Sequence, residues 1–133
     1  MNTMIKTLQK AMISIMIIAV IIVKIPALIA NAETLSDDNS VFKYGCSNGR
    51  YSVSLTNLGA DRYAQLNIYK YDNLTGAFVD SIGQEGILRK GATWSCSGYI
   101  TSKDYFIINA VIYNGTSSLT TPLSTWKTSL GDT

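Results

Sequence analysis

The chain has 133 residues, of which 11 are lysine or arginine, 9 are aspartate or glutamate and none is histidine. The absence of histidine removes the commonest general base, the Ser-His and Cys-His nucleophile pairs and the usual zinc ligand. The basic residues are scattered and form no stripe, so we expect no nucleic-acid partner.

The first 32 residues have the three parts of a secretory signal. Two lysines precede an apolar run over 11–23, and Ala30-Asn31-Ala32 forms a small-x-small cleavage site. The alternative is an uncleaved anchor over 11–30, but a lysine and a proline interrupt that run. We therefore predict a signal peptide over 1–32, a secreted product, and membrane contact only through this segment.

Cleavage after Ala32 would leave 101 residues with 8 basic and 9 acidic side chains, a net charge of −1. This length suits one domain. Glu33–Ser40 is polar, acidic and without periodicity, so we expect a flexible solvated tail. The folded domain is then expected over residues 41–133.

Seven later segments have the alternation, or the β-branched and aromatic content, of strands. They are Val41–Cys46, Arg50–Thr56, Arg62–Tyr71, Ala77–Ile82, Ala92–Ile100, Tyr105–Tyr113 and Ser118–Trp126. Gly83–Gly91 holds three glycines and is expected to be a loop from which Ile87 and Leu88 reach the core. The pattern predicts an all-β fold, a small antiparallel β-sandwich of seven to eight strands, with a small barrel as the alternative.

The segment Tyr105–Tyr113 is apolar on both of its faces, which predicts a central strand. Pro122 cannot donate a ladder hydrogen bond, which places the last strand at an edge.

Two cysteines, Cys46 and Cys96, follow the signal segment. In an oxidising compartment they predict one disulfide, which would close a loop of about 50 residues and add about 4 kcal/mol of stability. A pair of reduced thiols with a redox role is the alternative, but Cys-x-x-Cys spacing is absent.

The acidic residues offer no pair placed as a glycosidase requires, and two cysteines alone do not make a zinc site. We expect no enzyme activity, no catalytic residue, no metal and no cofactor.

Aromatic side chains are the more informative feature. Tyr63, Tyr69 and Tyr71 alternate with the apolar residues of one strand, so we predict that they share its outward face. Flat, half-polar rings suit sugar or protein recognition, and Tyr99 and Tyr113 could lie nearby. The alternative is that the tyrosines only pack against neighbouring strands.

Three short segments resemble bacterial immunoglobulin-like modules, such as the cell-adhesion-related domains of surface proteins. They are Leu55–Gly59 with its turn, Leu88–Trp94 before a later strand, and the apolar Tyr105–Val111. The resemblance implies an immunoglobulin-like sandwich.

These features predict a secreted, non-enzymatic binding module that acts outside the cell on a protein or glycan. Its docking residues would be Tyr63, Tyr69 and Tyr71, or the loop that carries Arg89 and Lys90. The alternatives are a small secreted toxin, bacteriocin or pore-former, and a protease inhibitor that presents Gly83–Gly91.

Overall fold

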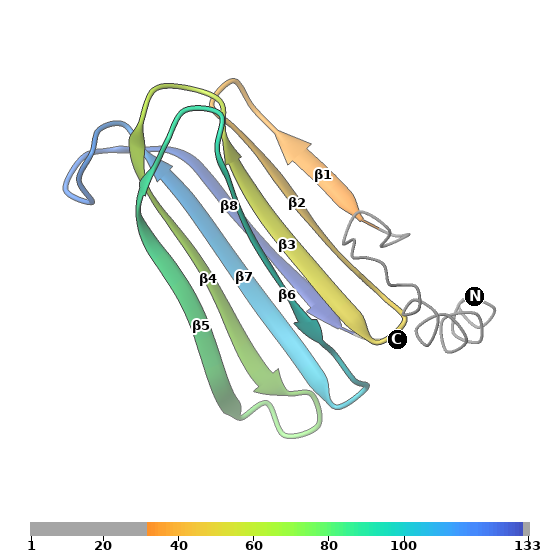
Figure 1. Cartoon of the computed structure of the whole chain (residues 1–133). Helices are drawn as coiled ribbons and strands as arrows, with labels where there is room; N and C mark the ends of the chain where they lie inside the picture. Colours follow the sequence, from red (N-terminus) through yellow and green to blue (C-terminus); the bar gives the residue numbers. More distant parts are fainter. Residues whose placement is uncertain (1–31, 132–133) are drawn as a thin grey trace.

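The computed structural model describes residues 32–131, and these form two antiparallel sheets packed face to face (Figure 1). The strands are β1 (Glu33–Ser36), β2 (Ser40–Ser47), β3 (Arg50–Asn57), β4 (Arg62–Asp72), β5 (Phe78–Leu88), β6 (Thr93–Tyr99), β7 (Asp104–Tyr113) and β8 (Pro122–Gly131). Sheet I has the order β1-β2-β3-β6, and sheet II has the order β5-β4-β7-β8. The all-β sandwich prediction is confirmed. The predicted signal segment lies outside the described residues, apart from Ala32.

The core forms where the alternating apolar positions of both sheets meet. Val53 and Leu55 of β3, Leu66 of β4, and Ile108 and Ile112 of β7 are buried. Each such side chain contributes about 1.5–3 kcal/mol by leaving water. Because the side chains of a strand alternate, this burial directs the intervening residues of each strand to the outside.

Two predictions about strand position are confirmed. β7 lies inside sheet II, between β4 and β8. β8, which begins at Pro122, is an edge strand. Only the inner face of β7 is covered by sheet I, so the apolar residues of its other face lie on the outside of the molecule.

The two sheets are offset by one strand. Phe42 of β2 stacks on Trp126 of β8 with 6.2 Å between ring centroids, and Tyr51 of β3 packs on Phe106 of β7 at 4.8 Å. The strand orders then place β6 over β4, and leave β1 and β5 uncovered at opposite sides, as Figure 1 shows. All residues of β1 and those of β5 from Phe78 to Glu85 are exposed.

The stretch expected to be a glycine-rich loop is mostly strand. β5 continues through Gly83 and Gly86 to Leu88, paired with β4 throughout. The glycine at position 83 lies close to a side chain of the neighbouring strand, because a Cβ there would lie 2.5 Å from Oδ1 of Asn67. Leu88 is buried as predicted, whereas Ile87 is exposed on the outer side.

The segment expected to be a flexible tail begins with β1, which pairs with β2. The turn that follows is held by Asp37. Its carboxylate accepts hydrogen bonds from the backbone N–H groups of Asn39 and Ser40 and from the Ser124 hydroxyl of β8. These bonds tie the start of sheet I to the edge of sheet II.

The predicted Cys46–Cys96 disulfide is not present. Cys46 lies opposite Tyr51 of β3, and Cys96 lies opposite Val53 of the same strand, so β3 runs between them. Strands two places apart are separated by about 9.6 Å, whereas disulfide-bonded Cα atoms lie within about 7 Å. The Cys46 thiol instead approaches the Gly131 carbonyl oxygen at 3.6 Å.

Cys96 lies beside the hydroxyl of Tyr51. Burial and, as a smaller cause, the neighbouring Cys96 thiol together raise the pKa of Tyr51 to about 12.

Candidate binding face

The outer side of sheet II carries a broad set of aromatic, amide and aliphatic side chains, which we name the tyrosine face. Its members come from three adjacent strands. They are Tyr63, Gln65, Asn67, Tyr69 and Tyr71 of β4, Tyr105, Ile107, Asn109, Val111 and Tyr113 of β7, and Phe78, Ser81, Glu85 and Ile87 of β5. From Tyr63 to Tyr71 the face runs about 26 Å, at about 3.3 Å per residue.

A connected polar cluster occupies one end of the tyrosine face. The Tyr113 hydroxyl donates to Oε1 of Gln65 at 3.1 Å, and Nε2 of Gln65 donates to the Glu85 carboxylate at 3.2 Å. The Tyr63 and Tyr113 rings meet edge to face, with centroids 5.6 Å apart. Partial desolvation raises the pKa of Tyr63, and the adjacent Glu85 carboxylate raises it further. The four side chains therefore form one connected cluster.

The other end of the tyrosine face is hollowed. Tyr71, Asn73, Gly76, Tyr105 and Ile107 line a shallow depression of about 310 Å³, together with Asp72.

This depression has a fixed wall. The ring of Phe78 packs edge-on against Tyr71 at 5.8 Å. Backbone N–H groups of Leu74 and Thr75 donate to the Asp72 carboxylate and lower its pKa, which fixes the turn after β4.

Tyr63, Tyr69 and Tyr71 share the outer side of β4, as the alternation predicted, with Tyr63 at one end of the face and Tyr69 and Tyr71 toward the other. The middle of the face combines the Tyr69 ring with the amides of Asn67 and Asn109, which lie directly opposite each other. An array of flat rings, aliphatic surface and amide groups can contact extended, hydroxyl-rich ligands over several strands.

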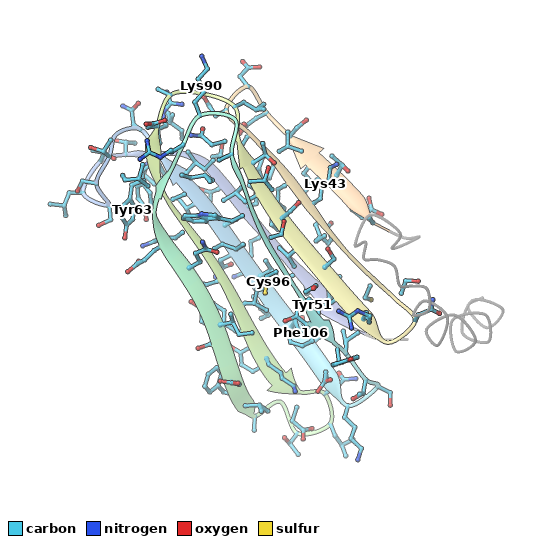
Figure 2. All side chains as sticks on the ribbon, in the orientation of Figure 1. Lys43, Tyr51, Tyr63, Lys90, Cys96 and Phe106 are labelled. Carbon is cyan, nitrogen blue, oxygen red and sulfur yellow. The ribbon has the colours of Figure 1, made fainter. Side chains whose placement is uncertain are left out.

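Arg89 and Lys90 lie elsewhere. They form the turn that leads from sheet II to sheet I, where Asp61 accepts a hydrogen bond from the Lys90 backbone N–H at 2.9 Å and pairs with the Arg89 guanidinium at 3.5 Å. Figure 2 shows Lys90 at one tip of the molecule, while Tyr63 lies at its side. The turn therefore lies just beyond the Tyr63 end of the tyrosine face and away from Tyr69 and Tyr71.

Tyr113 joins the tyrosine face, but Tyr99 does not. Tyr99 lies on the outer side of sheet I, where it is 75% exposed beneath the Arg50 guanidinium. Sequence reasoning missed Phe78, Tyr105 and Ile107 as members of the tyrosine face. The second apolar side of β7 was the available indication, but it was used only to predict a central strand.

The described residues hold no cluster of three or more histidine, cysteine, aspartate or glutamate side chains that could bind a metal ion. Within the same part of the chain, no helix has the length and apolar character needed to cross a bilayer.

No protein-family model matches the chain, and no curated protein matches it. Among solved structures, it is similar to part of Bacteroides uniformis beta-glucuronidase 2, at 11% identity and a TM-score of 0.40, over 75% of this chain and 12% of that one. It is also similar to part of an endonuclease/exonuclease/phosphatase from Beutenbergia cavernae, at 14% identity and a TM-score of 0.41, over 74% and 26% of the two chains. The chain spans a small part of each protein, and these similarities are too low to assign a family or an activity.

Proposed function

We propose that the protein is a secreted, non-enzymatic binding module whose tyrosine face holds an extended, uncharged glycan. The single observation that supports this most is the composition of that face, in which tyrosine rings and amide side chains occupy the uncovered side of a regular sheet. Rings provide flat apolar contact, while Asn67, Asn109 and Gln65 offer donors and acceptors for sugar hydroxyls.

The charge of the tyrosine face supports an uncharged ligand. Glu85 is its one charged member, and the Glu85 carboxylate already accepts a hydrogen bond from Gln65. On the adjacent β8, Lys127 lies opposite Asn109 and offsets that negative charge. A strongly anionic or cationic partner would require an excess of one charge, which the face lacks.

We also propose that the sandwich is immunoglobulin-like. The chain passes between the sheets at β3–β4, at β5–β6 and again at β6–β7, which places β2, β3 and β6 against β4, β7 and β8. This Greek-key path supports the assignment that the sequence resemblance implies.

Two features weigh against the alternative functions. Leu74 and Leu119 are 91% and 93% exposed, but they lie in turns at opposite ends of the sandwich, so one membrane surface could not receive both. A protease inhibitor would present an extended loop, whereas residues 83–88 of the expected loop are paired with β4.

The test is co-sedimentation of the purified protein with insoluble cellulose, chitin, xylan and peptidoglycan. We expect saturable binding to at least one of them, and Tyr69→Ala should weaken it by about 5- to 30-fold. Tyr99→Ala, a change of equal size on the outer side of sheet I, is the matched control and should bind normally. Absence of binding to every polysaccharide, or equal losses in both variants, would contradict the proposal.

A further inference from the structure

The one-strand offset of the sheets leaves two open corners of matching shape. At one side, the free edge of β6 lies beside the uncovered inner face of β5. At the other, the free edge of β8 lies beside the uncovered inner face of β1. Apolar side chains on these inner faces are exposed to solvent, with Ile82 at 50% and Leu35 at 38%.

We propose that a second copy of this chain fills these corners, so that copies associate head to tail into a continuous two-layer ribbon. β1 of one copy would pair with β6 of the next and cover β5. In the same step, β8 of the first copy would pair with β5 of the next. A one-strand overhang on each side suits such a joint, because the two seams then lie one strand apart: the β1–β6 seam is covered by the β4–β5 pair and the β8–β5 seam by the β1–β2 pair.

Strand direction supports this joint. Each sheet has four strands, and every neighbouring pair is antiparallel. The two edge strands of each sheet therefore run in opposite directions. A copy related by simple translation would therefore place antiparallel strands at both seams, so an antiparallel ladder can form in sheet I and in sheet II at the same time.

The backbone hydrogen-bonding groups also have the correct phase in sheet I. The β3–β6 ladder is continued by a bond from the Asn57 N–H to the Ala92 carbonyl, and the β1–β2 ladder by a bond from the Asp37 N–H to the Ser40 carbonyl. Antiparallel bonds recur at every second residue, so residues an odd number of positions from Ala92 in β6, or from Asp37 in β1, direct their backbone groups to the free edge. Ser95 of β6 and Thr34 of β1 are two such residues. Thr34 is also level with Ser95 across the sheet, through Lys43 and Ser54.

The side chains that would meet are complementary in sheet I. Leu35 is level with the half-buried Trp94, so the exposed leucine of one copy would lie beside that ring of the next. The acidic turn with Asp38 follows β1 and the basic turn with Lys90 precedes β6, so these turns would meet at the same end of the seam.

Sheet II has a matching contact. Lys127 of β8 is level with Gly83 of β5, one diagonal position from Glu85. Across the seam, Lys127 of one copy would therefore reach Glu85 of the next. Of the tyrosine face, this joint uses Glu85 at the β5 edge, and translation would place all tyrosine faces on one side of the ribbon.

The test is sedimentation velocity and negative-stain electron microscopy on the purified product of the full coding sequence, over a range of concentrations. We expect open chains that grow with concentration, since a head-to-tail contact without rotation does not close. A protein that stays monomeric throughout, or that forms only a closed dimer, would overturn the inference.

Ser95→Pro should abolish assembly, because the proline removes an N–H from the free edge of β6 and leaves the bonds to β3 intact.

Lys90→Glu and Asp38→Lys should each weaken assembly roughly tenfold, and the double variant should recover it. Lys103→Glu, in the turn at the opposite end of β6, is the control and should assemble normally. If the Ser95→Pro protein does not fold, the two charge reversals and their double variant still test the joint. The joint would be refuted if neither single charge reversal weakened assembly, or if the double variant assembled no more strongly than either single variant.

Discussion

The two outer faces of this sandwich differ sharply although the same alternation builds both. On sheet I, apart from the Arg50–Tyr99 pair at one end, the outward residues of β3 and β6 are small hydroxyl side chains, which we name the serine face: Ser52, Ser54, Thr56, Thr93, Ser95 and Ser97. On sheet II, the corresponding positions of β4 and β7 carry tyrosine, isoleucine, valine, asparagine and glutamine. Folding requires only that the inner positions be apolar. The serine face shows that small polar residues suffice outside, so the larger side chains of the tyrosine face need another explanation.

Neighbouring rings explain part of the difference. The Tyr63–Tyr113 and Tyr71–Phe78 contacts each stabilise the sheet by about 0.2–1 kcal/mol. This gain does not account for the exposed ring edges, the amide pair Asn67–Asn109, or the depression near Tyr105. These features are typical of a recognition surface, which is why the glycan proposal rests on this face.

The largest expected effect comes from the buried side of the same strand that carries the tyrosines. Leu66→Ala should lower the free energy of unfolding by about 2–5 kcal/mol, because Leu66 is 3% exposed and its removal leaves a cavity. Urea denaturation monitored by tryptophan fluorescence measures this loss. A change below about 1 kcal/mol would mean that the inner and outer sides of β4 have been assigned the wrong way round.

Much of this comparison could be predicted from sequence, and the exceptions have physical causes. Alternation in Arg62–Tyr71 gave the correct inner and outer sides of β4, because period two is a local property. The paired state of β5 was missed, because Gly83 was interpreted as a loop residue, whereas it faces the Asn67 side chain of the neighbouring strand.

Two further errors depend on which segments meet. The disulfide was expected because a cysteine count carries no information on which strands are neighbours. In the structure β3 lies between the strands that carry the two cysteines, which keeps them too far apart to bond. The outer side of β7 was not recognised as part of the tyrosine face, because an apolar strand face has the same pattern whether or not another sheet covers it.

The second prediction tests the connection that holds β1 and sheet II together. Burial raises the pKa of Asp37, but hydrogen bonds from the Ser124 hydroxyl and the backbone N–H groups of Asn39 and Ser40 lower it by more. Since the folded-state pKa lies below the unfolded value near 3.8, its stabilisation is present above that pH and is lost as the pH falls through the folded pKa.

Asp37→Asn should therefore cost about 1 kcal/mol at neutral pH, and the difference from the natural protein should vanish in acid. Chemical denaturation over a pH series measures both quantities. Asp38→Asn, one residue along the same exposed turn, is the control and should change stability little at any pH.

Tyr69→Ala is expected to separate stability from binding. Its ring is half-buried on the tyrosine face, so truncation should lower stability by less than about 1 kcal/mol. Glycan affinity should fall by about 5- to 30-fold, which corresponds to about 1–2 kcal/mol of binding free energy. A Tyr69→Ala protein that melts as early as Leu66→Ala would mean that the tyrosine face is held together for packing alone.

The smallest effect is expected on the serine face. Ser54 lies level with Lys43 and Ser95 at the centre of that face, and its side chain is half-exposed to solvent. Ser54→Ala removes one hydroxyl that water can replace, so the free energy of unfolding should change by no more than about 0.5 kcal/mol. Glycan binding should be unchanged. Thermal melting and the polysaccharide assay, run beside Tyr69→Ala, check both statements. If Ser54→Ala weakened binding as much as Tyr69→Ala, the contrast between the two faces would fail, because a ligand would then contact both sides of the sandwich.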